Sequence, residues 1–222
     1  MRLKRRIITT GDGSKTIQIE DWDEQYHSKH GAVQEAYHVF IAHGLRLFNN
    51  TNVNILEIGF GTGLNAFITF LEARKQQLKV DYVGVEAFPV SMDEVGELDY
   101  CSQLNANEYQ QVFDVMHKSR WEEKIAISED FSLHKQKKDF RDINEANLFN
   151  LIYFDAFGAR VQPELWTEEV FEKMFRALKK EGVLVTYAAK GSVRRALQAV
   201  GFTVERLPGP PGKREMLRGI KK

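Results

Sequence analysis

Val53-Asn54-Ile55-Leu56-Glu57-Ile58-Gly59-Phe60-Gly61-Thr62-Gly63 is the stretch that decides the fold class of this chain. Its apolar first half predicts a buried strand, and its glycines predict a tight turn into a helix over 63–76. Glycines let the backbone approach a ligand, and a helix N-terminus offers free N–H groups. The stretch therefore predicts a nucleotide-like ligand at the strand end, with a purely structural turn in an unrelated α/β protein as the alternative.

The spacing of the glycines separates two classes of ligand. It is G-x-G-x-G, whereas dinucleotide dehydrogenases use G-x-G-x-x-G. Glu57 precedes the first glycine by two residues, and a carboxylate there attracts an ammonium group but repels a pyrophosphate. We therefore expect S-adenosylmethionine, and the glycine spacing disfavours a nicotinamide oxidoreductase.

Apolar, β-rich runs alternate with helical stretches from residue 53 onward. The runs are 53–58, 80–85, 125–128, 150–154, 182–187, 202–205 and 215–220, and the clearest helices are 63–76, 164–179 and 192–199. This alternation predicts a mostly parallel sheet covered on both faces. Pro208-Gly209-Pro210-Pro211-Gly212 excludes a helix between the last two strands, which should therefore run antiparallel. The expected fold is α/β, a Rossmann-like class I methyltransferase domain over 51–222 with a seven-stranded sheet.

Residues 1–50 are predicted to form an N-terminal extension packed on this domain. Residues 7–19 alternate around a turn at Gly11-Asp12-Gly13-Ser14, which predicts a β-hairpin. Residues 20–31 read as a loop or a short helix, and the spacing of apolar residues predicts a helix over 33–48.

Size and composition place the chain in the cytoplasm. Its 222 residues fit one α/β domain with small additions. The single cysteine, Cys101, excludes an internal disulfide and suits a reducing compartment. No run approaches the ~20 apolar residues of a membrane helix, and the apolar run after the basic start is too short for an export signal.

The net charge of zero conceals an uneven distribution. Residues 1–15 carry five Lys or Arg against one acid, and residues 190–222 carry nine against two. If the two ends meet in the fold, they form a basic face on an acidic body, which suits a polyanion such as RNA. A solubilising tail and an ordinary basic start explain the same charges.

The ends of the later strands supply further candidate ligand contacts. Glu86 ends the second strand, where an acid accepts hydrogen bonds from ribose hydroxyls. Asp130 follows the expected third strand and could accept from an adenine amino group. Asp155 and Phe157 follow the fourth strand, beside the glycine turn, where a carboxylate can take the proton of an amine and a ring can shape a pocket for a flat base. A helix-capping role is the alternative for Asp155.

From about residue 20 to its end, the sequence resembles the tRNA 5-aminomethyl-2-thiouridine methyltransferases of the MnmC type. Besides the glycine turn with Leu64-Asn65, the motifs are Tyr26-x-Ser28 with Glu35, Val85-Glu86-Ala87-Phe88-Pro89, Asp155-Ala156-Phe157, Pro163-x-Leu165-Trp166, Val193-Arg194-Arg195-x-Leu197, Gly201-Phe202 and Lys213-Arg214-Glu215-Met216. The glycine turn alone is generic, whereas the Phe88-Pro89 pair and the final motif are more particular.

This resemblance implies methyl transfer from S-adenosylmethionine to the primary amine of 5-aminomethyl-2-thiouridine at the wobble position of tRNA, giving 5-methylaminomethyl-2-thiouridine. The cofactor site that it implies consists of Glu57, Gly59, Phe60, Gly61, Thr62, Gly63 and Asn65, with Glu86 at the ribose. Asp155 would meet the amine, with Phe157 beside it. Tyr26, Ser28 and Glu35 would close the pocket, and Arg194, Arg195, Lys213 and Arg214 would contact the tRNA backbone.

The sequence departs from the family pattern in two places. The bifunctional members continue into a flavin oxidase domain, whereas this sequence ends at Lys222, so we expect no flavin here and an aminomethyl precursor made elsewhere. Where Asp-Gly-Phe-Ala-Pro is typical, this chain has Asp155-Ala156-Phe157-Gly158-Ala159, which leaves the outer shape of the pocket open.

Other functions stay open at this point. The rivals are methylation of a different amine, on a small molecule or a protein, and a non-catalytic RNA-binding module. His27, His30, His38 and His43 lie within 17 residues and raise the question of a metal. No cysteine lies near them and the resemblance implies no metal, so we expect none.

Overall fold

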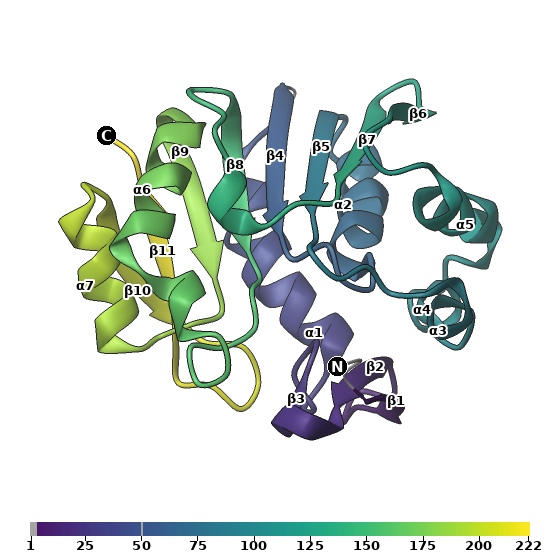
Figure 1. The fold of residues 1–222 in the computed structure, drawn as a ribbon. Coiled ribbons are helices and arrows are strands. Elements are labelled where there is room, and N and C mark those ends of the chain that lie inside the picture. The colour runs from purple at the N-terminus through teal and green to yellow at the C-terminus, as the bar shows by residue number, and fades with distance from the viewer. Residues whose placement is uncertain (1–3, 50) are drawn as a thin grey trace.

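The computed structural model describes residues 4–49 and 51–222. A central sheet has the order β10-β11-β9-β8-β4-β5-β7-β6 (Figure 1). Its strands are β4 (Asn52–Ile58), β5 (Lys79–Val85), β6 (Lys124–Ser128), β7 (Phe131–Gln136), β8 (Phe149–Phe154), β9 (Leu178–Thr186), β10 (Thr203–Pro208) and β11 (Glu215–Ile220). The five central strands are parallel, and β11 runs antiparallel to both of its neighbours, β9 and β10, of which the pairing with β10 was expected from the proline-rich connection. The predicted α/β class is confirmed.

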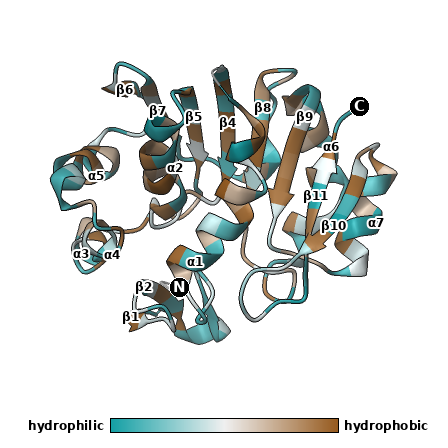
Figure 2. Ribbon diagram, turned by 180° about the vertical axis from the view of Figure 1, so that it is seen from behind, coloured by the Kyte–Doolittle hydropathy of each residue, from teal (hydrophilic) through white to brown (hydrophobic). Residues whose placement is uncertain are grey.

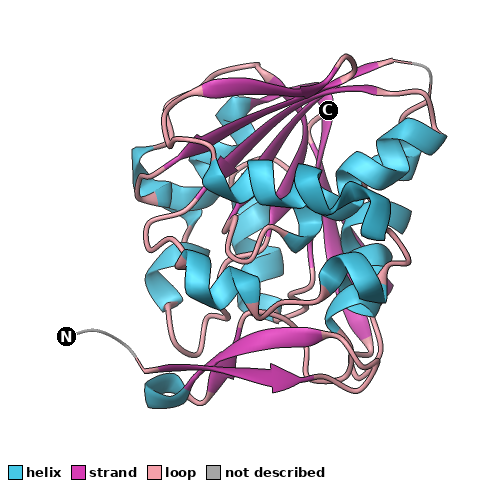
Figure 3. Ribbon diagram, turned by 90° about the vertical axis from the view of Figure 1, so that its right-hand side faces the viewer, coloured by secondary structure: helices cyan, strands magenta, loops and turns pink. Residues whose placement is uncertain are grey.

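Helices cover both faces of the sheet because alternate strand residues point to opposite sides (Figure 3). Ile55 and Tyr153 belong to a core under α2 (Leu64–Lys75), whereas their neighbours Leu56 and Phe154 belong to a second core under α6 (Glu168–Ala177). Figure 2 shows the resulting apolar strands between more polar helices. After the N-terminal extension, the structure also has the helices α3 (Met92–Gly96), α4 (Tyr100–Gln103), α5 (Gln110–Lys118) and α7 (Gly191–Ala199).

The third parallel strand is β7, and the prediction that it is 125–128 is wrong. Residues 124–128 form β6, an additional antiparallel edge strand that makes the sheet eight-stranded. Glu129 and Asp130 form the turn between β6 and β7, so Asp130 precedes the parallel strand. Its carbonyl accepts a hydrogen bond from the N–H of Val80 near the start of β5. Asp130 therefore lies at the amino edge of the sheet, away from the ends of the strands where ligands bind.

The N-terminal extension contains the expected hairpin, β1 (Arg5–Thr9) and β2 (Lys15–Ile19), with a short third strand β3 (Glu24–Gln25). The helix expected over 33–48 is broken: α1 (Ala32–Ala36) continues as π-helical turns over Tyr37–Ala42, followed by a 3-10 turn at Leu45–Leu47. The small sheet lies below the ends of β4 and β5 in Figure 1. It therefore covers the edge of the main sheet at which ligands bind.

The two ends of the chain come together only in part, because Arg5 and Lys213 line one cavity at the carboxyl edge of the sheet whereas Lys221 lies at the other edge. The Arg5 guanidinium donates to the Phe88 carbonyl, after β5, whereas the Lys221 ammonium donates to the Leu178 carbonyl, at the start of β9. These are opposite edges of the sheet, and the first three residues of the basic start lie outside the described residues. Within the described residues, no helix has the length and apolar character needed to cross a membrane.

Candidate active site

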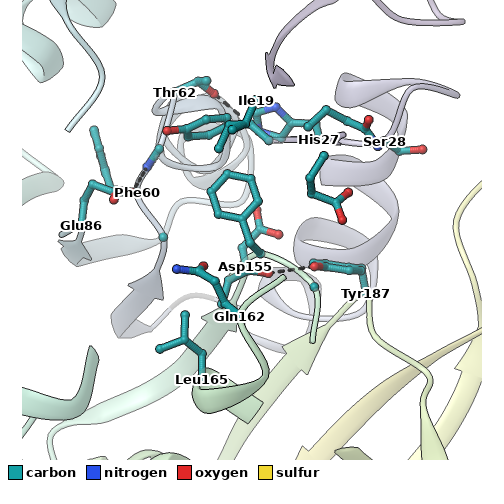
Figure 4. Close-up of a pocket in the computed structure, with 18 of the residues that line it drawn as sticks. Ile19, His27, Ser28, Phe60, Thr62, Glu86, Asp155, Gln162, Leu165 and Tyr187 are labelled. Atoms are coloured by element: carbon teal, nitrogen blue, oxygen red, sulfur yellow. Dashed lines mark hydrogen bonds between the residues drawn. The ribbon is translucent and has the colours of Figure 1, made fainter. Parts of the chain in front are cut away.

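A cavity of about 480 Å³ lies at the carboxyl edge of the parallel strands, under the N-terminal extension. Loops after β4, β5, β8 and β9 supply its walls together with residues 19–35. Figure 4 shows Glu86 on one side, Tyr187 on the opposite side and Asp155 between them. The cavity thus joins the strand ends that the sequence predicted to form one site.

The glycine turn needs its glycines for two separate reasons. Gly59 and Gly61 have φ angles of +90° and +49°, which other residues seldom adopt. A Cβ on Gly59 would lie 2.7 Å from the carbonyl oxygen of Asp155. Gly63, with φ of +71°, packs against the His117 ring and does not line the cavity. Gly63 therefore shapes the turn, and the prediction that it contacts the cofactor is not supported.

Glu86 is nearly buried and has acceptor capacity facing the cavity. Its Oε2 accepts from the Gly61 N–H at 3.1 Å and its Oε1 from the Phe88 N–H at 2.8 Å. Burial raises the pKa of this carboxyl, and the two N–H groups and Arg5 oppose that rise. Each oxygen keeps a second lone pair. Because the carboxylate bridges the glycine turn and the end of β5, it fits a ligand with two adjacent hydroxyls.

Glu57, Asn65 and Asp155 form a chain of side chains behind the cavity. The Asn65 Nδ2 donates to Glu57 Oε1 at 2.9 Å and to Asp155 Oδ2 at 2.8 Å. Glu57 is fully buried and does not line the cavity, so a direct contact with the cofactor, as predicted, is not what the structure provides. Burial raises its pKa well above the usual range. Asn65 and Asp155 do line the cavity, and the buried Asn65 Oδ1 has no hydrogen-bond partner among the described residues.

Asp155 titrates near neutral pH. Burial, followed by the nearby Glu35 carboxylate, raises its pKa to about 7, against the hydrogen bond from Asn65 and the charge of Lys213. A carboxyl with a pKa near 7 can both lose and accept a proton under physiological conditions. Asp155 is therefore the group in this cavity best suited to proton transfer.

Glu35 and Lys213 connect the N-terminal extension to the loop between β10 and β11. The Lys213 ammonium donates to Glu35 Oε1 at 2.6 Å and lies 3.9 Å from the centroid of the Tyr187 ring. The second oxygen of Glu35 accepts from the Ser28 N–H at 2.7 Å. The Tyr187 hydroxyl donates to the carbonyl of Ala156, next to Asp155. Ser28, Glu35 and Lys213 thus meet in one wall of the cavity, where the resemblance implied Ser28 and Glu35 as pocket residues and Lys213 as a contact to the tRNA backbone.

Aromatic rings surround Phe157. The ring centroids of Tyr26 and Trp22 lie 4.9 and 5.6 Å from that of Phe157, both edge to face. The Trp166 Nε1 donates to the Phe157 carbonyl at 2.8 Å, which holds the loop after β8 in place. The cavity therefore has one apolar, aromatic wall suited to a planar ring.

Several residues that line the cavity escaped sequence reasoning, and six predicted site residues do not line it, namely Glu57, Gly63, Asp130, Arg194, Arg195 and Arg214. Asp130 lies at the opposite edge, and Arg194 and Arg195 lie on α7, away from the cavity wall. Residues that line the cavity without having been predicted include Arg5, Trp22, Asp139, Arg141 and Tyr187. Tyr187 follows β9 directly, so the strand-end rule would have found it; Asp139 and its partner Arg141 follow β7, whose misplacement concealed them.

Three of the four clustered histidines, His27, His38 and His43, make contacts with neighbouring side chains that are typical of structural residues. The His27 ring is buried between the hydroxyls of Thr16 and Thr62, at 3.0 and 3.5 Å, and burial lowers its pKa to about 4. The rings of His38 and His43 pack edge to face at 4.9 Å. Among residues 4–49 and 51–222, no three His, Cys, Asp or Glu side chains are grouped as a metal site would require. The absence of a metal stays a prediction.

The sheet order and the glycine turn define a class I methyltransferase fold. The profile of a family described as S-adenosyl-L-methionine-dependent methyltransferase matches residues 102–222, more than half of the chain. The chain belongs to this S-adenosyl-L-methionine-dependent methyltransferase family.

The names of similar proteins agree with the family that the motifs resemble. The tRNA 5-methylaminomethyl-2-thiouridine biosynthesis bifunctional protein MnmC of Leptospira borgpetersenii is 31% identical over 220 residues, which cover 89% of this chain and 32% of that protein. The protein of the same name from Hydrogenovibrio crunogenus is 27% identical over 215 residues, 89% of this chain and 31% of the relative. The chain thus spans about a third of the length of these relatives.

Solved structures support the fold. MNMC2 from Aquifex aeolicus matches with a TM-score of 0.78 and 23% identity, over 100% of this chain and 71% of that one. Spermidine synthase from Thermotoga maritima matches with a TM-score of 0.56 and 14% identity, over 99% and 74%. At these identities the two structures establish the architecture alone.

Proposed function

We propose that this chain transfers a methyl group from S-adenosylmethionine to the primary amine of 5-aminomethyl-2-thiouridine at the wobble position of tRNA. The observation that carries the proposal is Asp155, a carboxyl with a pKa of about 7 between the glycine turn and the aromatic wall. Such a group can accept the proton that an amine loses. The similarity to bifunctional proteins of tRNA 5-methylaminomethyl-2-thiouridine biosynthesis supports the choice of amine.

The cavity fits the methyl donor in charge and in hydrogen-bonding capacity. S-adenosylmethionine supplies an electrophilic methyl group on a positive sulfur, next to an ammonium and a ribose. Six carboxylates against four Lys or Arg side chains line the cavity, which favours a cationic ligand. Glu86 would accept from the ribose hydroxyls, and the unpartnered Asn65 Oδ1 would accept from the ammonium. Glu57 then acts through Asn65, whose orientation it fixes.

The opposite part of the cavity suits an aminomethyl base. Only a neutral amine has a lone pair that can attack the methyl group, so the site must take up a proton. Asp155 lies where it can hold the amine and accept that proton, and Phe157 offers a ring face or edge to the uracil. Glu35 adds a second negative charge near Asp155, which favours the approach of a cationic amine.

The proposal includes the compartment. A tRNA substrate implies action in the cytoplasm, and the single buried cysteine, Cys101, agrees with a reducing environment.

A labelling experiment tests the function. The protein is incubated with methyl-labelled S-adenosylmethionine and tRNA from cells that lack this modification, and the tRNA is digested to nucleosides. Label in 5-methylaminomethyl-2-thiouridine is the expected result. Label in a small amine or in protein, with none in tRNA, would replace the proposal by the rival methyltransferase activity, and no transfer to any acceptor would favour a binding module.

A further inference from the structure

A second, more open cavity of about 760 Å³ adjoins the candidate active site. Four residues line both cavities, namely Glu24, Gly158, Tyr187 and Lys213. Gly158 lies between them with little around it: a Cβ there would approach only the Tyr187 hydroxyl and Glu24, at 3.7 and 3.9 Å. A molecule that extends out of the active site at this point therefore enters the second cavity, which we call the basic groove.

The basic groove has the opposite charge balance from the active site. Arg160, Lys190, Arg206, Lys213 and Arg214 line it, against the two acids Glu24 and Glu215. Arg160 is paired with Glu24 at 3.1 Å, and Arg206 with Glu215 at 3.7 Å. Among the described side chains, no carboxylate forms a salt bridge with Lys190 or Arg214, and both residues are exposed. Two cations are therefore available to an anionic ligand.

The wall that carries Arg214 is fixed in place. The Nε2 of His38 is hydrogen-bonded to the Pro208 carbonyl at 2.8 Å, and Lys213 forms an ion pair with Glu35. On the other side, Lys190 immediately precedes α7, and Val193 of that helix also lines the groove. The two cations thus project from separate elements that are each anchored, which favours recognition of a defined group over diffuse attraction.

We infer that the basic groove binds the phosphate of the nucleotide next to the methylated one, through Lys190 and Arg214. The inference rests on the proposed function. A substrate that is cationic at its reacting amine and anionic beside it matches an acidic cavity that opens into a basic groove. An aminomethyl nucleotide within an RNA strand has this charge order, since each nucleotide is joined to the next by a phosphate. A free amine or an isolated nucleoside would leave the groove unused.

Short RNA loops with one neutralised phosphate test the inference. The substrates are anticodon stem-loops that contain 5-aminomethyl-2-thiouridine, with a methylphosphonate at the phosphate on its 5′ or its 3′ side. One of the two replacements is expected to raise KM about tenfold for the wild-type protein, as the loss of a charge-assisted hydrogen bond would. In the double variant Lys190→Gln/Arg214→Gln, KM is already raised and the same replacement has no further effect.

A matched control and the free nucleoside separate this inference from the function itself. Arg176→Gln/Lys180→Gln removes the same charges from exposed residues near the start of β9, at the opposite edge of the sheet, and should behave like the wild type. The free nucleoside should be methylated equally by the wild type and the groove variant. The stem-loops can be methylated with a KM that neither methylphosphonate changes, or that changes by the same factor in the wild type and in the groove variant. Either result overturns the groove assignment alone. If neither the stem-loop nor the free nucleoside is methylated, the proposed function and the groove assignment are overturned together.

Discussion

The side-chain amide nitrogen of Asn65 lies 2.8 Å from Oδ2 of Asp155. The same nitrogen also donates to the buried Glu57. One amide therefore orients an acid that lines the cavity, Asp155, and an acid that does not, Glu57. A hydrogen bond to a carboxylate favours its ionised form and lowers its pKa. Asn65 thereby limits the rise in the pKa of Asp155 that burial and Glu35 cause.

Asn65→Leu should therefore move the pH dependence of methyl transfer. Without the donated hydrogen bond, the pKa of Asp155 rises above about 7, so the rate should reach half its maximum at a higher pH than in the wild type. The measurement is kcat against pH with both tRNA and S-adenosylmethionine saturating. Thr69→Val on the same helix removes a buried hydroxyl contact with Tyr153 and serves as the control for packing. An unmoved pH midpoint would mean that Asn65 does not set the pKa of Asp155.

Glu35→Gln should shift the same midpoint in the opposite direction. The Glu35 carboxylate raises the pKa of Asp155, and its removal also leaves the Lys213 charge uncompensated, which lowers that pKa further. Methyl transfer should therefore persist to lower pH than in the wild type. If the pH midpoint moves upward in both this variant and Asn65→Leu, the titrating group that limits the rate at low pH is not Asp155.

Asp155→Asn should lose activity and gain stability at alkaline pH. The amide cannot accept the proton, and loss of a general base costs about 10²- to 10⁴-fold in kcat. Since the pKa of Asp155 is raised in the folded protein, its neutral form stabilises the fold at low pH, and that stabilisation is lost as pH rises through about 7. The variant should thus exceed the wild type in Tm more at about pH 8 than at about pH 5, by thermal unfolding. An advantage that is independent of pH would show that ionisation of this carboxyl is not the cause.

Glu86→Gln should weaken binding of S-adenosylmethionine by about 10- to 100-fold, because hydrogen bonds to charged groups contribute about 1.5–3 kcal/mol. The amide keeps an acceptor for the backbone N–H groups of Gly61 or Phe88, so the turn is disturbed less than by alanine. Isothermal titration calorimetry gives the affinity, and Glu108→Gln, an exposed acid on the surface, is the control. Equal affinities for Glu86→Gln and the wild type would remove Glu86 from the ribose site.

The sequence predicted those parts of the site that local chemistry determines. The glycine turn, Glu86 and Asp155 each follow an apolar strand directly, and parallel strands bring such residues to one edge. Asp130 was misplaced because 124–128 and 131–136 are both β-rich and only pairing decides which strand joins β5. The burial of Glu57 behind Asn65 depends on packing between β4 and α2, which no pattern in one segment reveals.

Contacts between segments far apart in the chain could not be predicted from local sequence patterns either. Arg5 and Trp22 line the cavity only because the small sheet folds over the strand ends. The basic face was expected from the two chain ends together, whereas it is built from 160–214 around a groove beside the active site. Charge counts identified the cations but could not assign them to an edge of the sheet.

The Glu35–Lys213 pair joins positions 178 residues apart in the chain, and this separation has a consequence for biosynthesis. The wall of the cavity that they form cannot close until Lys213 has emerged from the ribosome, long after the glycine turn has been made. Contacts of such long range form late, because the intervening chain must first be ordered. A nascent chain can therefore form its glycine turn before the cavity is complete, and the wall of the cavity can close only after Lys213 has been made.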